Sequence, residues 1–361
     1  MLEEWVGSIP VSGRGGRSNY PKEIVIPMSL APRIEIIAEM ACSHEGDPAL
    51  ARKIIDGAGR AGADAVQFQI WLAKDMMVPH HAMYDTIVRL EMSREEWTGL
   101  AEYQRERYPD MEIIACVNEH ASVDFCETIG VDAYKLHSSD LANPDIVRRV
   151  AQTGRRIDLS VGASTLDEIQ TAIGWIRETS ASAIWMMYGY QNFPTPTDAI
   201  HLDYMATLRR VFDLPIGYQD HSDAEEPSAF WLPAAAAGMG VDILEKHITH
   251  DRSKKGIDHE AALNPDEFKR FVEMVREIEA ARGVSTARPF SDEEIKYRKY
   301  SKKSLVAARD LPAGTVLTRD DLVAMRAPEL GLPPDRITSL IGRTTTKAVE
   351  AFRLVTTTDV E

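Results

Sequence analysis

Long apolar runs are missing from this 361-residue sequence. The longest, around 232–240, is far shorter than the roughly 18 residues that a membrane-spanning helix requires. Positive charge is also scarce, because 41 lysines and arginines face 56 aspartates and glutamates and leave a formal net charge of −15. Such a surface repels nucleic-acid phosphates and anionic lipid, so we expect neither a nucleic-acid nor a membrane partner. A local basic pocket for a small anion is still compatible with this charge.

Cysteine is rare as well. Cys42, Cys116 and Cys126 are an odd number without C-x-x-C spacing, in a chain long enough to need no disulfides. They predict reduced thiols and a cytoplasmic protein. The first residues show neither the positive segment nor the apolar core of a secretory signal, and residues 1–30 are expected to be a flexible arm.

Short apolar runs alternate with helical patterns between residues 33 and 282. The predicted strands are Arg33–Met40, Asp64–Trp71, Glu112–Asn118, Asp132–His137, Arg156–Val161, Ala183–Tyr188, Leu214–Tyr218 and Asp242–Ile248. Alternation of this kind predicts a parallel sheet, and eight units in about 250 residues match a (β/α)8 TIM barrel. A doubly wound open sheet fits less well, because no G-x-G-x-x-G follows the first strand.

Helix boundaries carry recognisable signals. They are Asp47 before Pro48–Ala61, a capping box from Ser93 to Glu96, the pairs Asn143-Pro144 and Asn264-Pro265, and the expected C-cap glycines Gly62 and Gly130. The alternation stops near Gly283. We therefore expect a barrel over 31–283, a polar linker over 284–302 and a small β-rich domain over 303–361. Its predicted β-runs are Lys303–Ala308, Thr315–Leu317 and Leu322–Met325, with a turn at Pro333-Pro334.

Functional side chains of such barrels gather at the carboxyl ends of the strands. His221 and His247 fall at equivalent places on the seventh and eighth predicted strands, so their rings could converge on one ion. Two imidazoles suit Zn, Mn, Fe or Co and leave positions open for substrate and water. The alternative is that each histidine satisfies a buried hydrogen bond.

Lys135 lies in the middle of an apolar strand, where an unpaired ammonium would be costly. It could form an anion cradle with Ser138 and Ser160, or an internal ion pair with Glu245 or Asp140. Glu39 ends another apolar strand and could be a structural partner or an acid–base group. The other polar side chains of the candidate substrate site are Gln67, Gln69, Asp140, Gln191, Gln219 and Asp258.

These residues belong to motifs that resemble the sialic acid synthases. The motifs are Ile36–Gly46, Ala61–Gln69, Tyr134-Lys135, Pro194-Thr195-Pro196, Asp220-His221-Ser222 and Ile243–Asp258. The stretch Lys303–Glu361 resembles the antifreeze-like (SAF) domain that this family appends to its barrel. The resemblance covers about residues 33–361 and implies condensation of phosphoenolpyruvate with an N-acetylmannosamine-type aldose. The products would be a nine-carbon 2-keto acid and phosphate.

The resemblance also implies roles for single residues. His221 and His247 match ligands of Mn or a similar divalent ion, and Lys135, Ser138 and Ser160 match phosphoenolpyruvate contacts. Glu39 matches the glutamate near the reacting carbons, and Asp258 matches an aspartate that contacts the sugar. Arg326 matches an arginine that the SAF domain contributes to the other subunit's active site, which implies a domain-swapped homodimer.

Several positions depart from the family pattern. Gln67 stands where the family commonly has lysine, Gln219 where it has serine, and His137 where it has glycine. Residues 189–193 replace a more common His-Cys-Thr-Asn-x-Tyr pattern. The identity of the sugar is therefore open among sialic, spore-coat, legionaminic and pseudaminic types.

Two other functions compete with this one. The first is a catalytically silent sugar-binding or scaffold protein, against which the joint presence of Glu39, His221 and His247 argues. The second is condensation with a shorter aldose phosphate, as in the 3-deoxy-octulosonate synthases, which the SAF-like tail disfavours.

Overall fold

The computed structural model describes residues 33–283 and 288–361, which form two compact units. The arm predicted over 1–30 lies outside the described residues. No helix in the described part of the chain combines the length and the apolar character needed to cross a bilayer. Cys42, Cys116 and Cys126 are all buried and unpaired.

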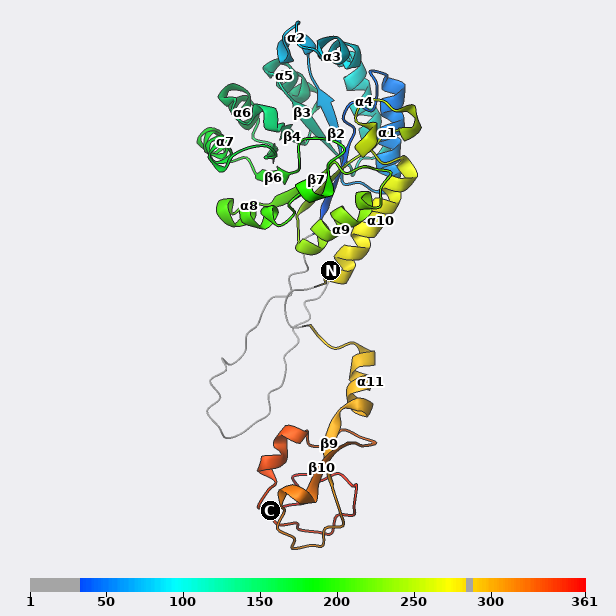
Figure 1. Cartoon of the computed structure of the whole chain (residues 1–361), viewed down its shortest axis with the longest axis vertical. Coiled ribbons are helices and arrows are strands. Elements are labelled where there is room, and N and C mark those ends of the chain that lie inside the picture. Colours follow the sequence, from blue (N-terminus) through cyan, green and yellow to red (C-terminus); the bar gives the residue numbers. More distant parts are fainter. Residues whose placement is uncertain (1–32, 284–287) are drawn as a thin grey trace. The chain divides into compact units, whose positions relative to one another are not determined.

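The first unit is a closed barrel of eight parallel strands, so the predicted fold is confirmed (Figure 1). In order, the strands are β1 Glu35–Glu39, β2 Ala65–Ile70, β3 Glu112–Val117, β4 Ala133–Leu136, β5 Arg156–Ser160, β6 Ile184–Tyr188, β7 Ile216–Asp220 and β8 Ile243–His247. The pairing of β1 with β8 closes the ring, with Glu39 opposite His247.

Helices surround this barrel. They are α1 Pro48–Ala61, α2 Ala73–Met76, α3 Tyr84–Leu90, α4 Arg94–Arg107, α5 His120–Ile129, α6 Pro144–Ala151, α7 Leu166–Thr179, α8 Tyr204–Phe212, α9 Ser228–Met239 and α10 Pro265–Arg282. The predicted caps are present: Asp47 accepts from Ala49 N, Ser93 and Glu96 form the capping box, and Gly62 ends α1 with φ 82°. Apolar side chains on the outward strand faces pack against the helices and form the main core.

The seventh strand begins two residues later than predicted. The apolar pattern indicated Leu214–Tyr218, whereas β7 covers Ile216–Asp220. Pro215 has no N–H to give to the ladder, so regular pairing starts after it. The shift brings Gln219 and Asp220 into the strand, with Gln219 facing the barrel interior.

Inside the barrel, an apolar layer separates two polar ends. The layer consists of Ile37, Ala65, Ile114, Ala133, Met187 and Ile243. At the amino ends of the strands, Arg156 bonds both oxygens of Glu35 at 2.6 and 2.9 Å and Asp158 at 3.0 Å. Its guanidinium lies 4.3 Å from the ring centre of Trp185 and 3.3 Å from the carboxylate of Glu112. The Arg156 guanidinium, paired with three carboxylates, therefore fills this end of the barrel.

The second unit contains α11 Asp292–Ser301 and the antiparallel strands β9 Lys303–Ala307 and β10 Leu322–Arg326. Part of the predicted linker 284–302 is therefore helical, because Ser291 and Glu294 form a capping box that starts α11. The predicted run Thr315–Leu317 forms only an isolated bridge between Val316 and Thr344. This unit is stabilised by a hydrophobic core of its own. The core includes Leu305, Leu317 and Val355.

Candidate active site at the carboxyl ends of the strands

Most of the predicted site residues meet above the apolar layer. Alternate residues of each strand face inward. The inward positions nearest the carboxyl ends carry Glu39, Gln67, Gln69, Cys116, Lys135, Ser160, Gln219, His221, Glu245 and His247. The fold thus gathers side chains from five of the six predicted motifs into one polar chamber.

His221 and His247 lie side by side in this chamber. Their ring centroids are 5.1 Å apart with the rings tilted by 67°. His221 Nδ1 lies 2.9 Å from the carbonyl oxygen of Tyr190 and donates to it in the neutral tautomer, which leaves Nε2 as a free acceptor. His247 is buried, and its Nδ1 has no hydrogen-bond partner in the described part of the chain. Only one ring therefore follows the alternative prediction of a satisfied histidine.

Both imidazoles are kept neutral. Burial lowers the pKa of His221 and lowers that of His247 well below its usual value. A neutral imidazole with an open nitrogen is the form that binds a divalent ion. The two histidines can therefore act as ligands of such an ion. They would be its two protein ligands, because the described residues contain no group of three or more His, Cys, Asp or Glu side chains that could hold one. An ion bound here would have open coordination positions for water and substrate.

Lys135 follows the ion-pair alternative. Its Nζ lies 2.6 and 2.7 Å from the two oxygens of Glu245 and 3.9 Å from Glu39, and all three side chains are buried. The sequence alone did not select Glu245 over Asp140. Asp140 instead accepts from Ser139 and from Asn143, next to the start of α6. In this structure the Lys135 ammonium is paired with the Glu245 carboxylate and is not free to bind an anionic ligand.

Ser160 and Gln219 extend this pair into a chain of hydrogen bonds. Ser160 Oγ donates to Gln219 Oε1 at 2.9 Å, and Gln219 Nε2 donates to Glu245 Oε1 at 3.1 Å. Both ends of the Gln219 amide are therefore used by protein groups. Gln219, predicted to bind substrate, orients Ser160 and Glu245 in this structure.

Glu39 reaches the chamber from the end of β1. One carboxylate oxygen accepts from Ala41 N at 2.5 Å and from Gln69 Nε2 at 3.2 Å, while the other has no hydrogen-bond partner among residues 33–283 and 288–361. Burial raises the pKa of Glu39 to about 8, against the opposing effect of the Lys135 charge. A carboxyl that titrates near neutrality, with one free oxygen, suits acid–base work.

Gln67 is fully buried beside Glu39 on the neighbouring strand. Neither its amide oxygen nor its amide nitrogen has a partner within the described residues. A buried amide without hydrogen bonds costs about 1–3 kcal/mol, and the Gln67 amide is therefore able to bond a polar group that enters the chamber.

Asp258 approaches from the loop after β8. Its carboxylate accepts from Cys42 N at 3.3 Å, and burial raises its pKa to about 6. This contact joins the loops that follow β1 and β8, and Asp258 is half-buried there. Its predicted contact to a sugar stays a prediction.

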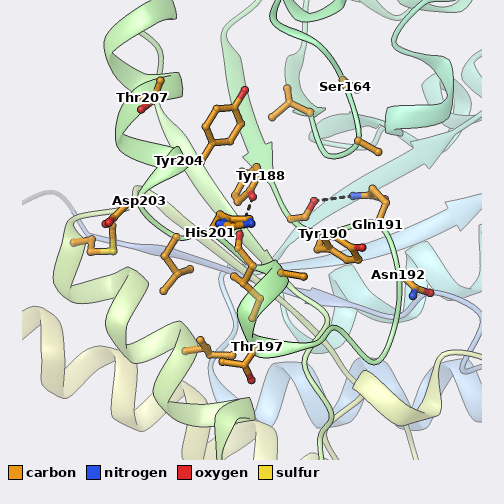
Figure 2. A pocket seen from close by; sticks show the side chains of 18 of the residues that line it. Ser164, Tyr188, Tyr190, Gln191, Asn192, Thr197, His201, Asp203, Tyr204 and Thr207 are labelled. Atoms are coloured by element: carbon orange, nitrogen blue, oxygen red, sulfur yellow. Dashed lines mark hydrogen bonds between the residues drawn. The ribbon is translucent and has the colours of Figure 1, made fainter.

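Ser138 and Gln191 stand apart from the network around Lys135. Ser138 begins a 3-10 turn and is half-buried, and Gln191 Nε2 lies 3.5 Å from the carbonyl oxygen of Gly189. Gln191 lines a cavity of about 1420 Å³ between the loops after β5 and β6, together with Tyr188, Tyr204 and His201 (Figure 2). Arg326 is exposed at the end of β10 in the second unit.

Glu245 lies at the centre of the chamber's hydrogen-bond network, although sequence reasoning named it only as one of two ion-pair partners for Lys135. The signal that could have found it is the alternation of β8, in which Ile243, Glu245 and His247 share one face. Ser43 and His44 were also left without a role, although Ser43 Oγ and His44 Nε2 are buried and have no hydrogen-bond partner among the residues that the structure describes. Turn residues after β1 gave no periodic signal from which their burial could be inferred.

Known proteins share this chain's sequence and architecture. An N,N'-diacetyllegionaminic acid synthase of Legionella pneumophila is 29% identical over 325 residues, covering 85% of this chain and 89% of the relative. The human N-acetylneuraminate-9-phosphate synthase is 28% identical over 329 residues, covering 87% and 89%. A crystal structure of the sialic acid synthetase from Leptospira borgpetersenii, in complex with citrate, superimposes with a TM-score of 0.68 at 28% identity and covers 77% and 95%.

Family models match both units. The model of the SAF domain matches residues 302–361, as the sequence predicted, and the model of the NeuB family matches residues 54–287. The second match spans more than half of the sequence and most of the barrel. The chain belongs to the NeuB family.

Proposed function

We propose that this protein condenses phosphoenolpyruvate with an N-acetylmannosamine-type aldose to give a nine-carbon 2-keto acid and phosphate. The observation that carries the proposal is the meeting of His221, His247, Glu39 and Lys135 in one buried chamber. The names of the relatives, which make sialic and legionaminic acids, support the same product class.

The proposed reaction forms one carbon–carbon bond. C3 of phosphoenolpyruvate attacks the aldehyde carbon, and the electron pair of the aldehyde C=O bond moves to oxygen, which takes up a proton and becomes a hydroxyl. Water then adds to the electron-deficient C2 and loses a proton. Finally the C2–O bond to phosphate breaks with its electrons on phosphate while the new C2 hydroxyl gives up its proton, which leaves the ketone and inorganic phosphate.

The side chains of the chamber divide this work. Glu39 orients the attacking water through its free oxygen and accepts the proton. Lys135 and Ser160 hold the anionic donor, for which Lys135 must share its ammonium between Glu245 and the ligand. His221 and His247 would hold a divalent ion, which we propose to be Mn²⁺, and this ion would supply a Lewis acid for the aldehyde oxygen.

The acceptor is tested by measuring phosphate release from phosphoenolpyruvate with a panel of aldoses. The panel holds N-acetylmannosamine, its 6-phosphate, a diacetamido hexose and a five-carbon aldose phosphate. We expect turnover with at least one acetamido hexose. Turnover with the five-carbon phosphate alone would favour the shorter condensation, and phosphate release with none would favour a silent sugar-binding protein.

We also propose that Arg326 acts in the active site of a second subunit of a domain-swapped homodimer. The residue is exposed on a small β-rich unit, where a guanidinium can bind a carboxylate or phosphate in bidentate fashion. Inactive Arg326→Ala and His221→Ala chains, when mixed, should regain up to about half of wild-type activity per mixed dimer, because one site carries neither lesion. Confirmed subunit exchange without recovered activity would contradict the swapped arrangement.

A further inference from the structure

Lys246 is a charged residue in an apolar layer. It lies on the outward face of β8, between the barrel and its helices, and is fully buried. The neighbouring outward residues Leu244 and Tyr218 belong to the main core. A lysine is almost never fully buried unless it is paired, so this position needs an explanation beyond packing.

The partner of Lys246 is Asp220 on the adjacent strand. Lys246 Nζ lies 2.5 Å from Asp220 Oδ2, and Asp220 is also buried. The carboxylate accepts three further hydrogen bonds, from the Tyr218 hydroxyl at 2.9 Å, Ser222 Oγ at 2.8 Å and Ser222 N at 3.3 Å. With four donors on two oxygens, the carboxylate is held in one orientation. It also ties down the chain on both sides of His221.

The place of this pair along the strands is specific. Asp220 and Lys246 are register partners, and they are the last pair in the ladder between β7 and β8. The next residue on each strand is one of the two chamber histidines, His221 and His247. Because successive side chains point to opposite faces, the ion pair lies on the outside directly before the rings on the inside.

Beyond this last rung, no backbone pairing between β7 and β8 fixes one histidine relative to the other. His221 is held from the loop after β6, whereas His247 pairs with Glu39 of β1 and is also held from the loop after β8. The His221 carbonyl accepts from Thr195 N at 2.9 Å, and the His247 carbonyl accepts from Leu263 N at 2.9 Å. The side-chain pair of Asp220 and Lys246 therefore joins the two strand ends where the ladder stops.

We propose that Asp220 and Lys246 are positioning residues that set the spacing of the His221 and His247 rings for binding a divalent ion. This inference rests on the metal site of the proposed function. An ion with only two protein ligands depends on both being in place before it binds, since ligands that must first be ordered lower the affinity. The plain alternative is an ion pair that stabilises the fold and has no effect on the ion.

The test is metal binding by the intact protein. Mn²⁺ affinity is measured by counting free Mn²⁺ by electron paramagnetic resonance, and Co²⁺ absorption in the visible range reports the ligand geometry. The test variant is the double substitution Asp220→Asn with Lys246→Met, which removes both charges and leaves none buried without a partner. We expect Mn²⁺ affinity to fall about 10- to 100-fold and the Co²⁺ spectrum to change. The single Lys246→Met variant, which leaves Asp220 uncompensated, should bind Mn²⁺ no better than the double variant.

Arg156→Met is the matched control, because it removes a buried cation from the opposite end of the same barrel. Circular dichroism confirms that each variant is folded at the temperature of the titration. Loss of Mn²⁺ affinity in the double variant with wild-type affinity in Arg156→Met would support the inference. Wild-type affinity and an unchanged Co²⁺ spectrum in the folded double variant would overturn it while leaving the two-histidine site intact. If the wild-type protein binds neither ion, the metal site of the proposed function fails as well.

Discussion

The two ends of the barrel both bury charged and polar side chains, but they differ in how completely these side chains are paired. At the amino end, Arg156 is surrounded by Glu35, Glu112 and Asp158, and each carboxylate has the guanidinium as a partner. At the carboxyl end, several buried polar atoms lack partners besides the paired network of Lys135, Glu245, Gln219 and Ser160. In the described part of the chain these atoms are Glu39 Oε2, Ser43 Oγ, His44 Nε2, both amide atoms of Gln67, His247 Nδ1 and, in the next loop, His250 Nδ1; Gln104 Oε1 in α4 is the exception.

This difference separates stability from function within one fold. Buried polar groups in folded proteins are normally satisfied, because each unsatisfied group costs about 1–3 kcal/mol. A cluster of them at one end marks the place where a ligand completes the hydrogen bonding. The comparison predicts that substitutions at the carboxyl end change activity more than stability, and that those at the amino end do the reverse.

The largest effect is expected at the histidine pair. His221→Ala or His247→Ala should lower phosphate release by more than about a hundredfold, since a bound ion contributes several kcal/mol to the barrier. Exhaustive chelation of the wild-type protein should do the same, and Mn²⁺ should restore the activity. Thermal unfolding should change little. Full activity in protein shown to be metal-free by elemental analysis would contradict the two-histidine site.

At the amino end, Arg156→Met should reduce the free energy of unfolding by about 3–5 kcal/mol, because it strands buried carboxylates. Burial raises the pKa of Glu35 to about 7 and that of Asp158 to about 6. These groups are protonated and uncharged in both folded proteins at low pH, so the loss of stability should grow as the pH rises through about 6 and 7, where they ionise in the wild type. Urea unfolding at several pH values measures this trend. A large drop in kcat in the folded fraction would break the comparison.

Lys135 tests whether the carboxyl end serves binding. Lys135→Ala should raise the KM for phosphoenolpyruvate far more than the KM for the aldose, by a factor equivalent to about 2–3 kcal/mol. Initial rates at fixed saturating aldose give the first constant, and the converse experiment gives the second. A variant that is destabilised yet kinetically normal would show that the pair with Glu245 is purely structural.

The smallest effect is expected at Gln67. Gln67→Leu removes two unsatisfied amide atoms and should raise the free energy of unfolding by about 1 kcal/mol. The same change should weaken substrate binding, which isothermal titration with phosphoenolpyruvate measures. A destabilised variant with normal binding would mean that Gln67 is satisfied within the fold.

Sequence periodicity sufficed for the barrel and for most of the site. Because strand ends of a parallel barrel must meet, locating His221, His247 and Glu39 at strand ends already predicted their proximity. The partners were harder to predict. Whether Lys135 pairs with Glu245 or with Asp140 depends on which way the side chains point across the barrel. The sequence does not give these directions for residues 135 and 245, which are 110 positions apart in the chain. Helix α11 was missed because its residues are charged on most faces and show almost no apolar period. The capping box at Ser291 was the only strong helix signal in this stretch.

The apolar layer of Ile37, Ile114 and Ile243 and their neighbours has a kinetic consequence. It stops the chamber from opening through the far end of the barrel, so that reactants and products share one mouth. The contacts proposed for the donor, Lys135 and Ser160, are fully buried in the chamber, whereas Asp258 is half-buried. We therefore expect the proposed donor, phosphoenolpyruvate, to enter before the proposed aldose, and the product held deepest in the chamber to leave last. Product inhibition measured against each substrate should show the patterns of this ordered binding and release.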